Sequence, residues 1–374
     1  MREDPTVYDP EVYRAADGFR SERLTLAREA QGLTQKALAE RIDTTPSAVS
    51  HFEADSAKPS PETVARLSLT LGYPPDFFSK ELGERLDLEA CHFRKLRSTP
   101  KRDQRQLLAR GDLLLSVLRE IEPLVSFPDE RISGLSSSEG SSHEIEGLAG
   151  KVREALSLGS GPISNMVDVL ENLGVIVLEL PGHSRELDAF STWADGRPLV
   201  FLSSEKHSSS RRRFDCAHEL GHLLMHRSAE PGNREHEAQA HRFAGAFLLP
   251  AESFAREYPK RLSWGHLRAL KRRWKVSLAA MVRRAFDLGL ITEATYRRAF
   301  VRLNQAGWRE REPDEPPMEH PSLLSKAIAA LTNAGHWNLE ELADASSLHL
   351  PMLQGLLRAA DPQPSLPLGG SGRI

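Results

Sequence analysis

The chain of 374 residues contains only two cysteines, Cys91 and Cys216, so no disulfide framework holds it together. It has no apolar run near the roughly 18–20 residues that span a bilayer. Its first residues are polar and acidic and lack the apolar core of a secretory signal. Basic and acidic residues nearly balance, 49 against 52, which excludes a wholly basic nucleic-acid coat but allows one basic face. We therefore expect a soluble, cytoplasmic protein without membrane contact.

The length is sufficient for two or three domains of ordinary globular composition, with 40% hydrophobic and 27% charged residues. Most of the pattern is helical. One β-branched run at 174–180 predicts a strand, and Asp195-Gly196 between two apolar runs predicts a hairpin. The expected fold is multidomain and mainly α. An N-terminal helix-turn-helix bundle of the five-helix type precedes an α+β domain with a small antiparallel sheet, and a helical C-terminal region follows.

Composition shifts give the expected boundaries. Residues 126–146 are rich in Ser, Gly and acids with little to bury, which is typical of a linker. In chain order we expect an N-terminal extension at 1–18, a helix-turn-helix domain at 19–85, a basic connector helix at 86–125, a flexible linker at 126–146, the α+β domain at 147–302, a loop at 303–320, a helical piece at 321–360 and a disordered tail at 361–374. The helical piece is expected to serve in packing or dimerisation.

Two short helices near the N-terminus have well-defined starts. Thr34 can cap the first helix, and Pro46 stands at the first position of the second, where its missing N–H costs nothing. Asp43 lies in the turn between them, and aspartate tolerates a left-handed backbone. Such a pair forms a helix-turn-helix, although a helical bundle for protein contacts has the same spacing. In a helix-turn-helix, the side chains presented to base edges would be Ser47, Ser50 and His51.

The segment LTQKALAERIDTTPSAVSHFEADSAKPSPETVARLSLTLG resembles the XRE (Cro/C1-type) helix-turn-helix family. The resemblance implies an operator in double-stranded DNA as partner and a homodimer on it. It also places Gln35 and Ser47 near phosphates or bases, and Ser50 and His51 on the reading face. The stretch 91–110 has seven basic residues against one acid and could add phosphate contacts, with a solvated face as the alternative.

The sequence HELGH spaces His218 and His222 four residues apart on an expected helix, so both imidazoles can reach one ion. Glu219 lies beside them, where its carboxylate can take a proton from a water whose pKa zinc lowers to about 7. Catalytic zinc takes three protein ligands and one open position. Two half-buried histidines on an amphipathic helix are the alternative. Candidates for the third ligand on the next helix are Glu235, Glu237 and His241.

HELGHLLMH, followed by EHEAQAHRFAGAFLLP, resembles the ImmA/IrrE family of zinc metallopeptidases. The resemblance covers residues 147–290 and implies a zincin-like domain with one Zn²⁺ per chain. It makes Glu219 the catalytic residue and assigns the metal to His218, His222 and Glu237, with His241 in reserve. Where the family has a second acid, this chain has Gln239, an amide and a poor zinc ligand.

Other side chains near the motif have simpler interpretations. We expect His226 to serve in packing or to lie at the surface, and Cys216 to be a small helix residue rather than an inhibitory thiolate. His207 and Tyr258 could stabilise an oxyanion, but the sequence selects neither. Residues 256–284 hold ten basic residues against one acid. That stretch could contact DNA, bind an acidic protein segment or form a solvated face.

Together these features favour a DNA-binding transcriptional regulator that carries a zinc-dependent endopeptidase. The resemblance implies cleavage of a specific regulatory protein in a stress or mobile-element response. Self-cleavage around 126–146 belongs to the same class. The main alternative is a non-enzymatic DNA-binding repressor or antitoxin whose metal fold acts as a sensor or scaffold. A protease with an adaptor-type helical bundle is a third hypothesis.

Overall fold

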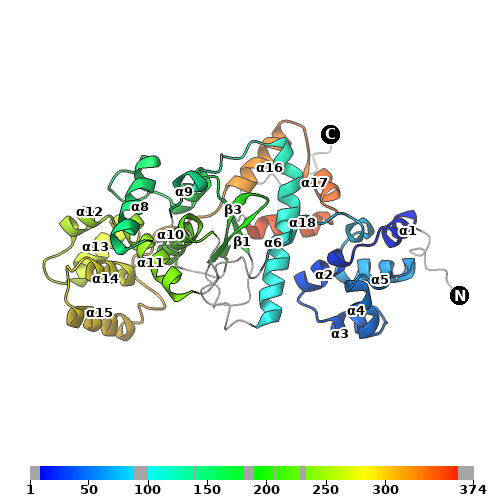
Figure 1. The fold of residues 1–374 in the computed structure, drawn as a ribbon, viewed down its shortest axis with the longest axis horizontal. Helices are drawn as coiled ribbons and strands as arrows, with labels where there is room; N and C mark the ends of the chain where they lie inside the picture. Colours follow the sequence, from blue (N-terminus) through cyan, green and yellow to red (C-terminus); the bar gives the residue numbers. More distant parts are fainter. Residues whose placement is uncertain are drawn as a thin grey trace, which may run out of the picture. The chain divides into compact units, whose positions relative to one another are not determined.

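The computed structural model describes residues 9–87, 100–137, 140–180, 189–204, 208–227 and 233–360. They form two compact units. The first comprises the described residues within Met1–Leu88, Leu96–Phe127 and Ser322–Ile374, and the second those within Pro128–Pro321. Helices dominate both units, and the described strands form one sheet in the second (Figure 1), as the sequence predicted. Among the described residues, no helix is long and apolar enough to cross a membrane.

The first unit begins with a bundle of short helices. They are α1 (Pro10–Asp17), α2 (Ser21–Ala30), α3 (Gln35–Arg41), α4 (Pro46–Glu53), α5 (Pro61–Leu71) and the 3₁₀ helix η2 (Pro75–Phe78). We expected α1 to be part of an N-terminal extension, yet it packs against α5 and η2. The cause is its apolar face, where Val12, Ala15 and Ala16 are buried.

Helices α3 and α4 start as the sequence predicted. Thr34 Oγ1 accepts a hydrogen bond from the backbone N of Ala37 at 3.1 Å, and Thr45 Oγ1 accepts one from Ala48 at 3.1 Å. Each bond satisfies one amide that the first turn of a helix leaves unpaired. Asp43 in the turn has a φ of 52°, the left-handed conformation expected for it. The two helices and their turn therefore form a helix-turn-helix.

A long helix, α6 (Lys101–Ile121), packs against α2 and also contacts the C-terminal helices. Those helices are α16 (Leu323–Asn333), α17 (Leu339–Ala345) and α18 (Leu350–Ala360), and the short η4 (Glu122–Leu124) follows α6. Ser347 Oγ donates a hydrogen bond to Asp76 Oδ2 at 2.6 Å, which joins the end of the chain to η2. The C-terminal helical piece thus packs within the unit that contains the helix-turn-helix. Residues 88–99 of the expected connector lie outside the described residues.

The second unit is α+β. Its helices are α7 (Ile132–Leu135), α8 (Ser142–Ala155), α9 (Met166–Asn172), α10 (Ser209–Met225), α11 (Arg234–Leu248), α12 (Ala251–Glu257), α13 (Trp264–Trp274), α14 (Leu278–Asp287) and α15 (Glu293–Gln305). Helix α7 and the start of α8 lie within 126–146, where we expected a flexible linker. That expectation was wrong for the described residues, because Ile132 and Ile145 are buried in the core of this unit and Ser141 with Glu144 forms a capping box.

The sheet contains β1 (Ile176–Leu180), β2 (Ala189–Ala194) and β3 (Arg197–Ser203) in the order β1-β3-β2. The Asp195-Gly196 hairpin joins β2 and β3 as an antiparallel pair, as predicted. Strand β1 pairs with β3 in parallel, so the sheet is mixed and not antiparallel as we expected. The apolar run of β3 is buried on both faces. That burial explains why β3 takes the central position and why an all-antiparallel order was the wrong expectation.

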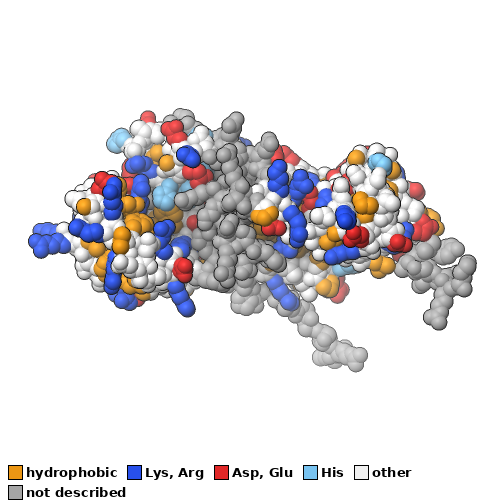
Figure 2. Space-filling model, turned by 90° about the horizontal axis from the view of Figure 1, so that it is seen from below, with side chains coloured by type: hydrophobic (Ala, Val, Ile, Leu, Met, Phe, Trp, Pro, Cys, Tyr) orange, Lys and Arg blue, Asp and Glu red, His pale blue; other side chains and the backbone are white. Residues whose placement is uncertain are grey.

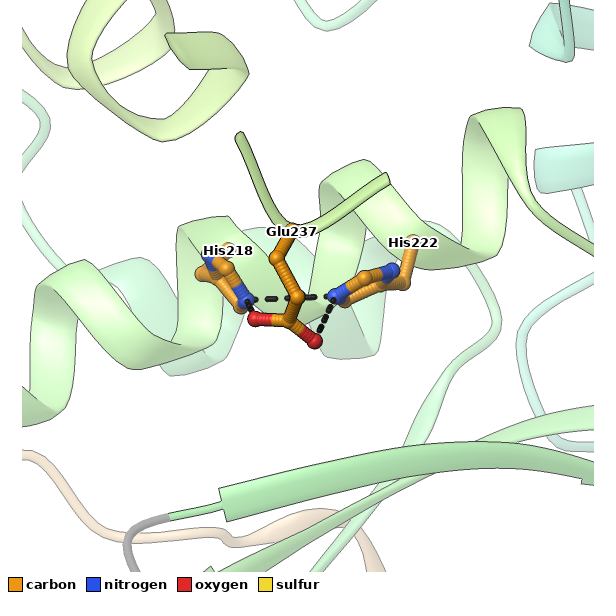
Figure 3. A group of neighbouring side chains, drawn as sticks. All are labelled: His218, His222 and Glu237. Carbon is orange, nitrogen blue, oxygen red and sulfur yellow. Dashed lines mark hydrogen bonds and ion pairs between the residues drawn. The ribbon is translucent and has the colours of Figure 1, made fainter. Parts of the chain in front are cut away.

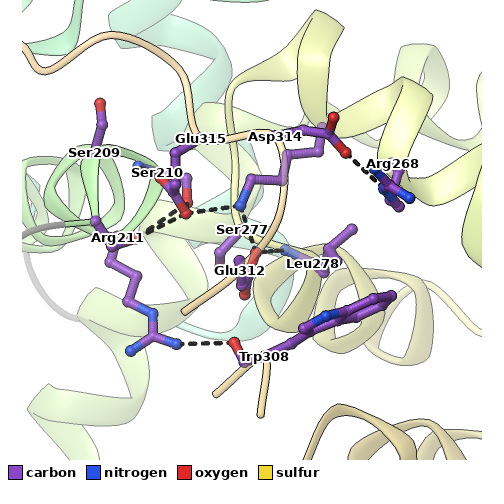
Figure 4. A network of polar contacts seen from close by, with 12 residues as sticks. Ser209, Ser210, Arg211, Arg268, Ser277, Leu278, Trp308, Glu312, Asp314 and Glu315 are labelled. Atoms are coloured by element: carbon purple, nitrogen blue, oxygen red, sulfur yellow. Dashed lines mark hydrogen bonds and ion pairs between the residues drawn. The ribbon is translucent and has the colours of Figure 1, made fainter. Parts of the chain in front are cut away.

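Acidic residues that follow α15 pair with the basic helices of the same unit (Figure 4). Buried Lys271 places its Nζ 2.7 Å from both Glu312 Oε2 and Glu315 Oε1. Glu315 also accepts a hydrogen bond from the backbone N of Ser210 at 2.9 Å, and Arg268 donates to Asp314 at 2.6 Å. A buried ammonium needs such compensation. Much of the positive charge at 256–284 is therefore paired within the unit.

Gly174 ends the turn between α9 and β1, and its environment gives a stability prediction. Its φ is +78°, and a Cβ there would lie 2.4 Å from the Asp129 carbonyl oxygen. We expect Gly174→Ala to lower the free energy of unfolding by about 2–5 kcal/mol, since backbone strain and overpacking add. Gly159 also has a positive φ, +61°, but open space around its Cβ position. Gly159→Ala should cost only about 1–2 kcal/mol in the same denaturant titration. Equal losses for both variants would contradict the overpacking.

Candidate metal centre and recognition helices

Three potential metal ligands converge between α10 and α11 (Figure 3). His218 and His222 lie one turn apart on α10, and their Nε2 atoms are 3.1 Å apart. Glu237 in the first turn of α11 faces both rings, with Oε2 at 3.4 Å from His218 Nε2 and Oε1 at 3.5 Å from His222 Nε2. All the ligand atoms lie within 4.8 Å of one another. The structure thus brings together the three side chains to which the family resemblance assigned the metal.

This geometry fits a zinc ion. Zinc–nitrogen and zinc–oxygen bonds of about 2.0–2.1 Å give a tetrahedron whose edges are about 3.3 Å. The separation of the two Nε2 atoms, 3.1 Å, is close to that edge, and each ring has one of the two Glu237 carboxylate oxygens at 3.4 or 3.5 Å. In addition, Glu237 Oε2 is buried without a hydrogen-bond partner. A buried carboxylate oxygen in that position needs a cation.

The protonation states also suit a metal. Burial lowers the pKa of His222 to about 4, so its ring is neutral near pH 7 and can use a nitrogen lone pair. Burial acts to raise the pKa of Glu237, but the neighbouring His218 and His222 rings outweigh it and hold that pKa well below its ordinary value. Zinc requires neutral histidine and ionised carboxylate ligands. His222 and Glu237 meet these conditions before any ion binds.

The close approach of α11 to α10 depends on Gly221 in the HELGH sequence. A Cβ at this position would lie 3.2 Å from Ala240 Cα and 3.2 Å from Phe243 Cδ1, so a larger residue would push the helices apart. Gly221 lies between the two histidines and Ala240 one turn after Glu237. The small residue therefore helps to bring the carboxylate within reach of both rings.

Glu219, next to His218 on α10, contacts the sheet. It is buried, and Ser191 Oγ on β2 donates a hydrogen bond to Glu219 Oε2 at 2.7 Å. Burial raises the pKa of Glu219 well above its ordinary value, and the Ser191 bond opposes that rise. A carboxyl group with a raised pKa can exchange a proton near neutral pH. Sequence reasoning missed Ser191, because only the pairing of β2 with β3 brings it to α10.

His226 contacts His222 on the side away from the other candidate ligands, and Gln239 in turn contacts His226. His226 is 1% exposed, and its Nδ1 lies 3.1 Å from His222 Nδ1. Its Nε2 lies 2.8 Å from Gln239 Oε1 on α11. The expectation that His226 serves only in packing or at the surface was therefore incomplete, since its ring contacts a candidate ligand. Its position four residues after His222 was the available signal. Gln239 lies outside the group of three ligand atoms.

The remaining candidates do not belong to the group of three converging ligand atoms. The His241 ring packs on Phe214 with centroids 4.7 Å apart, and Glu235 is exposed. Burial raises the pKa of Tyr258 to about 12, and its hydroxyl is buried without a hydrogen-bond partner. Cys216 is fully buried and burial raises the pKa of its thiol, which opposes a thiolate role. His207 lies outside the described residues.

The first unit presents the candidate reading face. Ser47, Ser50 and His51 are all exposed on α4. Gln35 is half-buried, and its amide donates to Glu53 Oε2 at 2.8 Å, so it ties α3 to α4. At the start of α6, the exposed basic side chains are Lys101, Arg102 and Arg105. Figure 2, a view from below Figure 1, shows Lys and Arg side chains over this part of the unit.

Comparison with known families gives one match over the helix-turn-helix and another over the candidate metal centre. Residues 24–78 match the helix-turn-helix family, and residues 170–286 match the peptidase M78 family, described as the IrrE N-terminal-like domain. The chain joins these two domains. They support a DNA-binding regulator with a peptidase-like domain. None of the curated proteins compared with the chain matches it.

The converging geometry predicts which side chains hold metal. Glu237→Ala should abolish the binding of one zinc ion per chain, because it removes the carboxylate that faces both Nε2 atoms. His241→Ala should retain zinc, because that ring packs on Phe214. Zinc per chain, measured by atomic emission after dialysis, checks both variants. The assignment would be contradicted if His241→Ala lost zinc and Glu237→Ala retained it.

Proposed function

We propose that this protein is a cytoplasmic transcriptional regulator that binds an operator as a homodimer and carries a zinc-dependent endopeptidase. Its substrate would be a partner regulatory protein cleaved in a stress or mobile-element response. The observation that carries the proposal is the convergence of three ligand atoms beside a buried glutamate. That combination serves metal-assisted peptide hydrolysis better than a structural metal site, which commonly closes all four positions with protein ligands.

The residues divide into holding and proton-transfer roles. His218, His222 and Glu237 would hold zinc, which when bound polarises a peptide carbonyl and lowers the pKa of water. Glu219 takes the proton from the attacking water and passes it to the departing amine. Its raised pKa suits the second role, because the carboxyl group holds a proton more readily than an ordinary glutamate does. Ser191 fixes the orientation of that carboxyl group through its hydroxyl.

The first unit supplies the DNA-binding half of the proposal. The second helix of a helix-turn-helix enters the major groove with its N-terminal residues. On α4 those exposed residues are Ser47, Ser50 and His51, which can donate and accept hydrogen bonds. The basic start of α6 adds side chains suited to phosphate contacts. Because the Gln35 amide donates to Glu53, Gln35 contributes to DNA binding either by holding α3 against α4 or by exchanging Glu53 for a group on the DNA.

Glu219→Gln separates metal binding from proton transfer. We expect the variant to retain zinc, since Glu219 is outside the converging group, and to lose cleavage by at least 100-fold, because an amide cannot accept the proton. Purified wild-type and variant chains, both loaded with zinc, are incubated with protein extract from the source cell. New amino termini are then identified by mass spectrometry.

The outcome decides between the two leading functions. Termini that appear with the wild type and not with Glu219→Gln support the peptidase. Cleavage that survives in the variant would overturn the role of Glu219. If the zinc-loaded wild type forms no new termini, while its DNA affinity changes on zinc removal, the non-enzymatic regulator with a metal-sensing domain is the better account.

The reading face gives a second prediction. His51→Ala and Ser50→Ala should each weaken binding to a selected operator by about 5–150-fold, as expected for base contacts worth about 1–3 kcal/mol. The operator is first selected from random duplexes with the wild-type chain, and dissociation constants are measured by fluorescence anisotropy at fixed salt. Leu69→Ala, at an exposed position on α5, is the control. Equal affinity for all three variants and the wild type would place the reading face elsewhere.

A further inference from the structure

A chain of polar contacts runs from Gln239 through His226 to His222. The contacts are 2.8 Å from Gln239 Oε1 to His226 Nε2 and 3.1 Å from His226 Nδ1 to His222 Nδ1. All three side chains are buried, with 8%, 1% and 2% exposure respectively. His226 also stacks on the ring of His236, with centroids 4.5 Å apart, which restrains its plane. The proposed peptidase reaction uses neither His226 nor Gln239.

The direction of this chain follows from the atoms at its outer end. An amide oxygen only accepts hydrogen bonds, so the Nε2 atom of His226 must carry the proton. In a neutral ring, Nδ1 of His226 is then an acceptor. His222 must therefore donate from its own Nδ1. The remaining nitrogen of His222, Nε2, then carries a lone pair and no proton.

That nitrogen is the one that faces the cluster. His222 Nε2 lies 3.1 Å from His218 Nε2 and 3.5 Å from Glu237 Oε1. With the amide of Gln239 turned around, its NH₂ group would donate to His226, and each proton along the chain would move to the other nitrogen. The proton on His222 would then occupy Nε2 and block that atom as a ligand.

We propose that Gln239 and His226 are positioning residues that hold His222 in the tautomer with a bare Nε2 atom directed at the metal site. Gln239, which occupies the position of the second acid in the resembled family, thus acts on the metal site through His226 and is not itself a ligand. Partners behind a metal-binding histidine commonly fix its tautomer and ring orientation. The inference rests on the proposed zinc site, but its tautomer can be measured without metal.

The first test is the tautomer itself. In metal-free, ¹⁵N-histidine-labelled wild-type protein, long-range proton–nitrogen correlation spectra should show His222 protonated at Nδ1. The His222 signals are those lost in a His222→Asn chain. Gln239→Leu, which keeps similar size without an acceptor, should give a mixture of tautomers. A wild-type His222 protonated at Nε2 would overturn the proposal, whether or not the chain binds zinc.

The second test is zinc affinity, measured by competition with a chromophoric chelator. His226→Phe and Gln239→Leu should each weaken zinc binding about 10–100-fold, the usual cost of losing such a partner. His226→Gln, whose amide oxygen can still accept from His222, should bind zinc more tightly than His226→Phe. A role in packing alone does not predict that recovery. His266→Phe, at an exposed histidine on α13, should match the wild type.

The results separate this inference from the proposed function. Wild-type zinc affinity in Gln239→Leu and His226→Phe, with circular dichroism showing that both are folded, would overturn the positioning role and leave the zinc site intact. A wild-type chain that binds no zinc would overturn the peptidase proposal, and the nitrogen spectra would still decide the tautomer. If His226→Phe unfolds and Gln239→Leu does not, the zinc affinity of Gln239→Leu decides whether the positioning role holds.

Discussion

The close packing of α10 against α11 is the constraint on which the candidate metal centre depends. A glycine between two histidines lets the backbone of α11 approach, since a Cβ at Gly221 would already lie 3.2 Å from Ala240 Cα. Each helix carries only part of the site. Two rings on α10 and one carboxylate on α11 make a group of three candidate ligands only because the helices approach so closely. Core residues from both helices, including Leu220 and Phe243, hold that packing.

The packing of α10 against α11 also sets the pKa values of the ionisable groups in the candidate metal centre. Burial keeps the His222 ring neutral near pH 7, and the two histidines keep Glu237 ionised. On the sheet side, burial acts in the opposite sense on Glu219 and raises its pKa. Two glutamates near one cluster therefore have separate chemistry, one suited to bind a cation and one to move a proton. The strand β2 takes part as well, because its Ser191 holds the Glu219 carboxyl group.

Pairing of charges within the second unit changes how its basic helices are understood. The sequence shows a run of basic residues at 256–284, which is open to contact with an acidic partner. In the fold, Glu312 and Glu315 neutralise Lys271, and Asp314 pairs with Arg268. The acids come from a segment that sequence reasoning treated as a loop. A charge run is thus a poor guide to a binding surface until its internal partners are known.

Local patterns determined much of this protein from sequence alone. Helix caps such as Thr34, the Asp195-Gly196 hairpin and the His218–His222 spacing depend on neighbours within a few residues, so the sequence could predict them. The resemblance to known families supplied Glu237 as the candidate third ligand. Only the tertiary structure decided the rest. The parallel pairing of β1, the contact of Ser191 with Glu219 and the chain from Gln239 to His222 join distant segments, whose meeting depends on how the whole core packs.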